Sequence, residues 1–431
     1  MSDRRGIPRR EFVKAAVAIG GASALAACLD RSDADVPRGP EDVSSLPERQ
    51  HAWNDVLATD DHGNPVAPRH RVLLLVNYRG EGEPTASDRE TVEATLQGLE
   101  RAYERSNEGL LLTLSYSPYY FERFDASLPD SVDLPEPGAL APFEDPDPDA
   151  PDAVVHLASD HAQVVLGAEE ALRGNRTTAN GVDQPGTPFT DVFEVAERRT
   201  GFVGRGLPAD NQDVEGVPDS KPVDEDAPLY MGFKSGFEGN QATEDRVTIQ
   251  EGPFAGGSTQ HISHMALNLD QWYEQDGRYQ RVAKMFCPHH AAEGTVEGTG
   301  DNLGTETGMD DCKGVTDAAR EEGVVGHSQK MFAIREDGKP LILRRDFNST
   351  DGGHSGLHFL ALQREISEFV KTREAMNGSD AADVSAVGQR NNNGILQYVD
   401  VTNRGNYLLP PRSLRALPPA TPERKVADAS A

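Results

Sequence analysis

The stretch TQHISHMALNLDQWYEQDGRYQRVAKMF, from Thr259 to Phe286, indicates a strand that runs directly into a helix. The strand is expected over residues 259–269, and Asp270 is placed to cap a helix over residues 270–286. The elements expected after it are strands over residues 340–347 and 356–363 and a helix over residues 364–376. This part of the chain therefore has the order β-α-β-β-α.

The same order of elements is found earlier in the chain. The run HRVLLLVNYR, from His70 to Arg79, has the length of a strand, and Ser87 is placed to cap the helix that follows. The remaining elements are strands over residues 110–117 and 152–159 and a helix over residues 162–173. Two such repeats predict an α+β fold made of two ferredoxin-like halves with antiparallel sheets.

The boundaries of these halves follow from the elements. We expect the first half to cover residues 69–204 and the second half to cover residues 259–412. A long irregular connection, from about 174 to 258, is predicted between their regular elements, and residues 205–258 are interpreted as a pocket loop. Long loops inside a compact body are usually functional or disordered. The tail, residues 413–431, is expected to be disordered.

The composition is that of a polar and strongly acidic protein. Its 431 residues are enough for one large domain or two ordinary ones with a buried core. The net charge is -29 at pH 7, and the mean hydropathy is -0.57. This balance argues against nucleic acid as a partner, because phosphate binding needs a basic surface that the sequence lacks. Asp and Glu are spread along the whole chain, which is typical of the solvated surfaces of proteins from salt-loving (halophilic) organisms.

An export signal is expected at the N-terminus. Arg9 and Arg10 stand in the motif PRREFVK, and an apolar run over residues 15–27 follows them. This is the twin-arginine pattern, which carries folded proteins across a membrane. The apolar run is too short to span a bilayer comfortably, and an uncleaved N-terminal anchor is the alternative interpretation. Export after folding also suits a protein that takes up a cofactor before it leaves.

A lipid anchor is expected at Cys28. The sequence LAAC, which ends at this residue, resembles a lipobox, in which the cysteine becomes the lipidated first residue of the mature protein. Residues 29–68 are rich in Asp, Pro and Ser and are predicted to form a disordered tether. We therefore expect the body of the protein to lie outside the cytoplasm, tethered to the cell membrane.

Several segments resemble, in the correct order, segments of the dye-decolorising (DyP-type) haem peroxidase family. These segments are LTLSYSPYYFER (112–123), DAVVHLASDHAQVV (152–165), MGFKSG (231–236), GGSTQHISHMALNLDQW (256–272), GHSQK (326–330), LILRRDF (341–347) and GLHFLALQREISEFV (356–370). The resemblance covers about residues 70–412. It implies the fold of that family, two ferredoxin-like halves that hold a haem.

The resemblance implies a haem b site with a single histidine ligand. His327 matches the proximal ligand, which coordinates iron through one imidazole nitrogen, and a neighbouring acceptor is expected to hold the other nitrogen. Arg344 matches the distal arginine, whose charge would stabilise the negative charge that develops as bound peroxide splits. Arg345 follows it, but adjacent side chains of a strand point to opposite faces, so only one of the two can face the haem, and Arg344 is the expected one.

The loop MGFKSG departs from the family at one position. It resembles the haem-pocket loop, which places Gly232, Phe233 and Gly236 beside the cofactor. Ser235 stands where the family has an aspartate, a residue that can move a proton between the two oxygens of peroxide. A serine hydroxyl is not a base near pH 7 without an activating partner. Glu238 is therefore a hypothetical source of the missing carboxylate, if the loop turns back on itself.

Two interpretations are open for the cysteines that follow the anchor. A disulfide between Cys287 and Cys312 suits an oxidising compartment and would close the acidic, glycine-rich segment between them. The motif CPHH, from Cys287 to His290, could instead bind zinc or copper, which favour thiolate and imidazole ligands.

The leading interpretation is an exported, membrane-anchored haem peroxidase that reduces peroxide with an unknown reducing substrate. A homo-oligomer is one option for its assembly. One alternative is a non-catalytic haem-binding or haem-delivery lipoprotein, and a second is a lipoprotein that binds metal through its Cys/His cluster. An intense Soret band would separate the haem proteins from the metal-binding one. Peroxide-dependent oxidation of a dye would then separate the first two.

Overall fold

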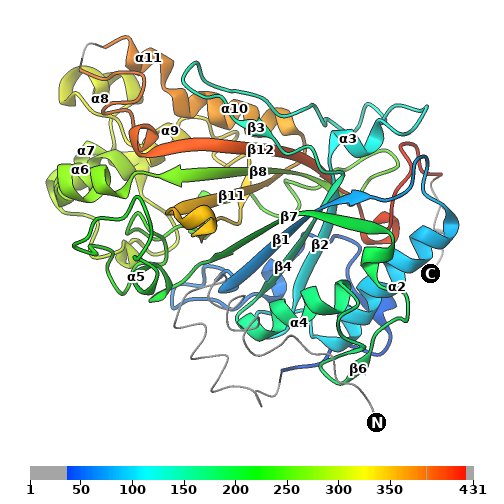
Figure 1. Cartoon of the computed structure of the whole chain (residues 1–431). Coiled ribbons are helices and arrows are strands. Elements are labelled where there is room, and N and C mark those ends of the chain that lie inside the picture. Colours follow the sequence, from blue (N-terminus) through cyan, green and yellow to red (C-terminus); the bar gives the residue numbers. More distant parts are fainter. Residues whose placement is uncertain (1–35, 385, 424–431) are drawn as a thin grey trace.

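The computed structural model describes residues 36–384 and 386–423. The first half contains six main elements in the ferredoxin-like order β-α-β-β-α-β (Figure 1). They are β1 (His70–Tyr78), α2 (Ala86–Ala102), β2 (Leu111–Tyr116), β4 (Ala153–Ser159), α4 (Ala162–Leu172) and β7 (Phe193–Phe202). The strands pair antiparallel in the order β7-β1-β4-β2.

The second half repeats this order with a divided second strand. Its main elements are β8 (Ser258–Leu267), α6 (Arg278–Met285), β9 (Leu343–Arg344), β10 (Phe347–Ser349), β11 (Gly356–Gln363), α10 (Ile366–Asn377) and β12 (Val399–Leu409). The strands pair antiparallel in the order β12-β8-β11-β9. The predicted α+β fold of two ferredoxin-like halves is therefore confirmed.

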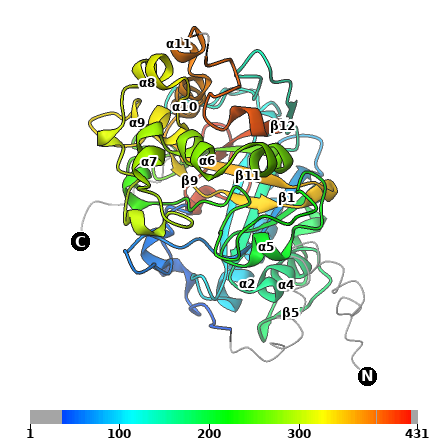
Figure 2. The same ribbon diagram turned by 90° about the vertical axis from the view of Figure 1, so that its left-hand side faces the viewer.

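The two half-sheets join into one closed, barrel-like sheet. At one junction, Tyr116 of β2 pairs with Leu408 of β12. At the other, Phe202 of β7 pairs with Asn348 of β10, and β10 also pairs with β11. The strands consequently form a continuous ring, with α2 and α4 on the outside of the first half and α6 to α11 beside the second (Figures 1 and 2).

Both faces of the central strands are covered, which explains their uninterrupted apolar runs. In β1, Val72 and Leu74 pack in the cluster that includes residues of α2 and α4. Leu73 and Leu75 point the other way and pack with residues of the second half, including Leu360 of β11. Successive side chains of a strand alternate between faces, so a strand that is covered on both sides is apolar at every position.

Several predicted boundaries are wrong. The connection from about 174 to 258 is not irregular throughout, because β7 lies within it. The helix expected over residues 270–286 is divided into a π-helical turn (Gln271–Gln275) and α6, and Asp270 makes no side-chain cap. Ser87 lies inside α2, whose cap is Thr85. The strand expected over residues 340–347 is divided into β9 and β10.

Shorter elements complete the described part of the chain. They are α3 (Pro118–Phe121), β3 (Asp147–Pro148), β5 (Thr178–Ala179), β6 (Val182–Asp183), α5 (Leu207–Asp210), α7 (Pro288–Glu293), α8 (Val315–Glu322), α9 (His327–Phe332), α11 (Ser379–Ala382) and several single 3-10 turns. None of the helices within residues 36–384 and 386–423 is long and apolar enough to cross a membrane.

Residues 36–68 pack against the body instead of forming the disordered tether that their composition predicts. Trp53 is 1% exposed and packs with Leu111 of β2 and Ala158 of β4. Its backbone amide donates to Glu244 Oε1 (2.6 Å). The expectation of a tether is therefore wrong for the described residues of this stretch.

Part of the predicted disordered tail is also ordered. Arg415 is buried and forms ion pairs with Glu93 and Glu100 of α2. The twin-arginine motif, Cys28 and residues 29–35 lie outside the described residues, as do residues 424–431.

Candidate functional site

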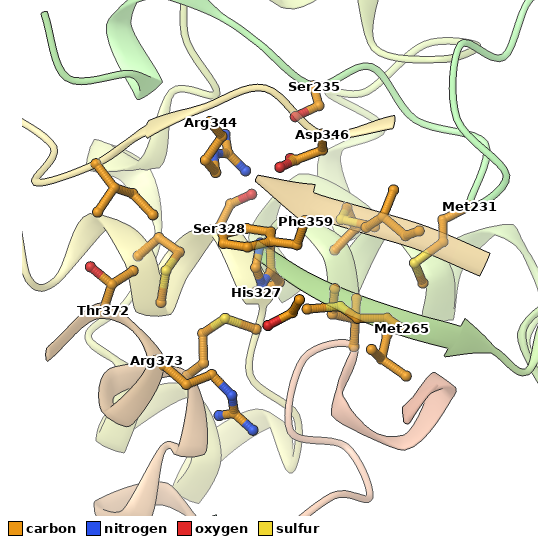
Figure 3. A pocket seen from close by; sticks show the side chains of 18 of the residues that line it. Met231, Ser235, Met265, His327, Ser328, Arg344, Asp346, Phe359, Thr372 and Arg373 are labelled. Atoms are coloured by element: carbon orange, nitrogen blue, oxygen red, sulfur yellow. The ribbon is translucent and has the colours of Figure 1, made fainter. Parts of the chain in front are cut away.

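A mostly apolar cavity of about 200 Å³ lies in the second half of the protein (Figure 3). Strands β8 and β11, helices α9 and α10 and the loop around residues 229–237 contribute its lining. Five of the seven methionines of the sequence border it, namely Met231, Met265, Met285, Met331 and Met376. Methionine is unbranched and polarizable, so a wall of this kind can change shape around a ligand. We call this space the inner cavity.

His327 is the first residue of α9, and close packing fixes its position. The Gly326 amide donates to Gln329 Oε1 (2.9 Å), which closes the first turn of the helix. A Cβ atom at position 326 would lie 1.7 Å from the carbonyl oxygen of Phe286, so only glycine allows α9 to start this close to the end of α6. On its other side, the Gly394 amide donates to the Val325 carbonyl (2.9 Å).

The imidazole of His327 is neutral at physiological pH. It borders the inner cavity but lies deep in the protein, and this burial, together with the charges of Arg344 and Lys330, lowers its pKa to about 3. Its Nδ1 atom is buried and has no hydrogen-bond partner among the described residues. The acceptor expected for the second nitrogen is therefore not found at Nδ1. A neutral imidazole that no protein group engages at one nitrogen is suited to binding a metal.

Arg344 reaches the inner cavity from β9. Its backbone amide donates to Gln241 Oε1 (2.9 Å), and Gln241 Nε2 donates to its carbonyl (3.2 Å). Arg345 turns away from the inner cavity, packs over the ring of Trp53 and donates to Glu244 Oε1 (3.0 Å). The structure thus places the first arginine in the cavity lining, on the face that the sequence analysis chose for it.

The loop that contains Ser235 is anchored at its start. The Tyr230 amide donates to Asn348 Oδ1 of β10 (2.9 Å), and the Trp272 indole donates to the Met231 carbonyl (3.0 Å). Of the residues predicted from this loop, Phe233 and Ser235 border the inner cavity.

Three other residues of this loop lie elsewhere. Gly232, predicted to contact the cofactor, has a φ of +82°, and a Cβ there would lie 2.9 Å from Tyr273 Oη, so it serves the turn. Gly236 and Glu238 border only a second, outer space, and the Glu238 side chain is exposed. Glu238 therefore lies outside the inner cavity, and the hypothesis that it supplies the missing carboxylate is not supported.

This second space is a polar cleft of about 870 Å³, here called the outer cleft. It is lined largely by charged and polar residues of both halves and of the N-terminal segment. Five residues border both spaces, namely Leu229, Lys234, Ser235, Arg344 and Asp346. We call these five residues the mouth. A small polar molecule in the outer cleft therefore meets Ser235, Arg344 and Asp346 first, before it meets His327 (Figure 3).

The sequence analysis missed Asp346. It stands two residues after Arg344, and side chains at this spacing on an extended strand share a face. Its Oδ1 atom is buried and unpaired within the described part of the protein. Burial raises the pKa of Asp346 to about 6, although Arg344, the Leu360 backbone and Arg71 act in the opposite direction. The alternation that selects Arg344 over Arg345 could have identified this residue.

The two cysteines after the N-terminal region form a disulfide. Cys287, which precedes α7, is bonded to Cys312, and His290 Nδ1 lies 2.9 Å from the first sulfur and 3.2 Å from the second. Within the described ranges, these three residues are the group of Cys, His, Asp and Glu side chains that is compact enough for a metal ion. With the sulfurs bonded to each other, no thiolate is available, so the structure favours the disulfide interpretation over the metal site.

A model of a family of unknown function, DUF7405, matches residues 68–411, which include both halves and the inner cavity. The chain belongs to the DUF7405 family. No curated protein matches the chain.

The fold of this DUF7405 member is similar to the solved structures of dye-decolorising peroxidases. A dye-decolorizing protein from Vibrio cholerae has a TM-score of 0.53 at 16% identity, over 84% of this chain and 98% of that chain. A DypB variant from Rhodococcus jostii, solved in complex with heme, has a TM-score of 0.55 at 14% identity, over 85% and 97%. A peroxidase from Bacteroides thetaiotaomicron has a TM-score of 0.52 at 14% identity, over 84% and 99%. At these identities, the similarity shows a shared fold.

Proposed function

We propose that this DUF7405 protein binds haem b in the inner cavity, with His327 as the iron ligand, and reduces peroxide at the expense of an unidentified reducing substrate. One observation carries the proposal. A neutral histidine and an arginine border the same apolar cavity, in a fold shared with a protein that was solved with heme.

The residues of the inner cavity fit a flat, largely apolar ligand. Phe233, Phe359 and Phe369 border it together with the five methionines. Its volume of about 200 Å³ is below the roughly 300–1,000 Å³ of a typical cofactor pocket, so binding requires side chains to move. Methionine side chains change rotamer more easily than branched or aromatic ones, so the free-energy cost of this adjustment is small. His327 would hold the iron, and the two cysteines within the described residues, Cys287 and Cys312, are bonded to each other and offer no competing thiolate.

The polar residues of the mouth then act on the peroxide. The guanidinium of Arg344 would stabilise the negative charge that develops as the O–O bond breaks. Ser235 can position peroxide or water by hydrogen bonds, but its hydroxyl cannot take a proton near pH 7. The haem, when bound, supplies the redox chemistry. The outer cleft gives small molecules a polar route to these groups.

Titration with haemin tests this proposal. The wild-type protein should develop a Soret band with one haemin per chain, and His327→Ala should lose or strongly shift that band. The exposed His289 offers a matched control, and His289→Ala should behave like the wild type. The loaded wild-type protein should then oxidise a dye when peroxide is added. A Soret band without turnover would favour the haem-binding or haem-delivery alternative, and no band at all would exclude both.

We also propose that the protein is exported by the twin-arginine route and anchored through Cys28. The support is the motif at Arg9 and Arg10, with the apolar run and lipobox-like sequence that follow. Replacement of both arginines by lysine should leave the protein in the cytoplasm, as measured by cell fractionation. Unchanged membrane association outside the cytoplasm would contradict this route.

A further inference from the structure

We infer that Asp346 is the distal acid–base residue of this site, the carboxylate that takes a proton from peroxide and returns it to the leaving oxygen. This inference rests on the proposed function and deepens it. It replaces the two positions that the sequence indicated, Ser235, which has no carboxylate, and Glu238, which lies outside the inner cavity.

The first support is position. Asp346 lies between β9 and β10, two residues after Arg344, and both border the inner cavity and the outer cleft. Figure 3 shows Arg344, Asp346 and Ser235 together on one side of the cavity, with His327 on another. A group that acts on peroxide has to lie near the arginine and away from the iron ligand. Asp346 lies on the Arg344 side of the cavity, and the charge of Arg344 acts on its carboxyl (Figure 3).

The second support is one unpaired oxygen of the carboxylate. Oδ1 is buried and accepts no hydrogen bond from the residues that the structure describes. Buried polar atoms are almost always paired, and exceptions are concentrated where a ligand or water completes the bonding. In contrast, two other acidic residues of the outer cleft, Asp60 and Asp160, accept hydrogen bonds from side chains or backbone amides.

The third support is the electrostatic setting. Burial raises the pKa of Asp346 to about 6, while the charges of Arg344 and Arg71 and the backbone of Leu360 hold it from rising further. A general base works best when its pKa lies near the operating pH, because it is then ionised often enough to accept a proton and basic enough to hold it. Lys234 is the remaining charged residue of the mouth, and His327, which lies deeper in the inner cavity, is neutral.

In this role Asp346 moves one proton between the two oxygens of peroxide as the O–O bond breaks. One oxygen of hydrogen peroxide loses its proton to the Asp346 carboxylate, and Asp346 passes this proton to the other oxygen. The O–O bond breaks, its electron pair leaves with that oxygen, and the first water is released. The haem, when bound, would supply the two electrons that the remaining oxygen lacks. The reducing substrate would later restore these two electrons, so that with two protons the remaining oxygen leaves as the second water.

Cyanide binding to the haemin-loaded protein tests Asp346 without relying on turnover. Hydrogen cyanide also has to give up a proton as it binds on the peroxide side, so its association rate reports a distal base. In the wild type, this rate should change with an inflection near pH 6, the pKa of Asp346. Asp346→Asn should lower the rate about 100-fold and remove the inflection, within the range known for general base catalysis. Asp346→Glu should restore part of both.

Glu238→Gln is the control, because it neutralises an acidic residue that borders only the outer cleft. It should keep the wild-type rate and pH profile. The inference is overturned if Asp346→Asn keeps the Soret band and binds cyanide within twofold of the wild-type rate, or if Glu238→Gln loses as much. A wild-type protein without a Soret band would instead overturn the proposed function.

Discussion

The charge state of Asp346 has a consequence for stability that needs no cofactor. The pKa of this carboxyl is raised from an ordinary value of 3.8 to about 6, mainly by burial. Between these values the native state holds a proton that the unfolded state has released. Stability therefore falls as the pH rises from about 4 to 6, and the loss persists above pH 6.

We predict that Asp346→Asn makes the haem-free protein more stable at pH 8, by about 3 kcal/mol, because it removes the buried charge. At pH 4 the wild-type carboxyl is already protonated, so the gain should vanish. Urea unfolding at both pH values measures this difference, and Glu238→Gln serves as the exposed control. A gain of equal size at both pH values would contradict the assigned titration.

At the residue scale, the sequence predicted what a local motif and strand alternation can supply. His327 and Arg344 both border the inner cavity, whereas Arg345 faces away from it; their roles toward a haem stay predictions. The position of Glu238 could not be predicted, because it depends on where an irregular loop goes after Phe237. Strand alternation places Asp346 on the same face as Arg344, so its position was predictable. The family resemblance instead indicated the loop around Ser235 as the place of the distal acid.

At the scale of elements, the disulfide joins the start of α7 to the segment before α8, next to α9. Cys287 and Cys312 are separated by 25 positions. Cys287 also follows Phe286, whose carbonyl packs against Gly326 at the start of α9. The disulfide therefore limits the freedom of the unfolded chain and keeps the base of the His327 helix in place.

We predict that replacing both cysteines by serine costs about 3 kcal/mol in the free energy of unfolding, by the loop-closure argument. It should also weaken haemin binding, because the contact between α6 and α9 loosens. Urea unfolding with and without dithiothreitol measures the effect, and only the wild type should respond to the reductant. Identical unfolding midpoints for the two proteins would show that the bond contributes nothing.

The strands that the sequence predicted are covered on both faces, whereas the strands that it did not predict have exposed, polar positions. Strands β1, β4 and β11 are covered on both sides and show apolar runs. The sequence of β7, FEVAERRTGF, places Glu194 and Glu197 on its exposed positions, and β12 begins with the polar run VDVTNR. Such strands resemble loops in sequence, which is why the last strand of each half was missed.

At the scale of the whole molecule, the N-terminal segment is part of the folded body. Arg345 stacks over Trp53 (4.2 Å to the ring centroid), and Glu244 accepts hydrogen bonds from both residues. The composition of residues 29–68 predicts disorder. Burial of the large Trp53 side chain in the body of the protein nevertheless holds this segment in place.

We predict that Trp53→Ala lowers the free energy of unfolding by about 3–5 kcal/mol, the usual cost of removing a buried aromatic side chain. Val66, which is 40% exposed, lies in the same segment, and Val66→Ala should change stability by less than about 0.5 kcal/mol. Thermal unfolding of the three proteins measures this. Equal midpoints for Trp53→Ala and the wild type would restore the interpretation of this segment as a tether.

The closure of the sheet into a ring could not be predicted from the sequence. Each junction between the halves rests on one residue pair, Tyr116 with Leu408 and Phe202 with Asn348. No pattern within a strand specifies a partner almost 300 positions away. The repeat of element order predicted two similar halves, whereas their union into one ring had to be seen in the structure.

Every role proposed for these residues depends on the binding of iron porphyrin beside His327. The most direct measurement is a crystal structure of the haemin-loaded protein with anomalous scattering data collected at the iron edge. The account predicts one strong iron peak within coordination distance of an imidazole nitrogen of His327, on the side of the cavity that faces Arg344 and Asp346. An iron peak elsewhere in the molecule, or none in crystals of protein incubated with excess haemin, would contradict it.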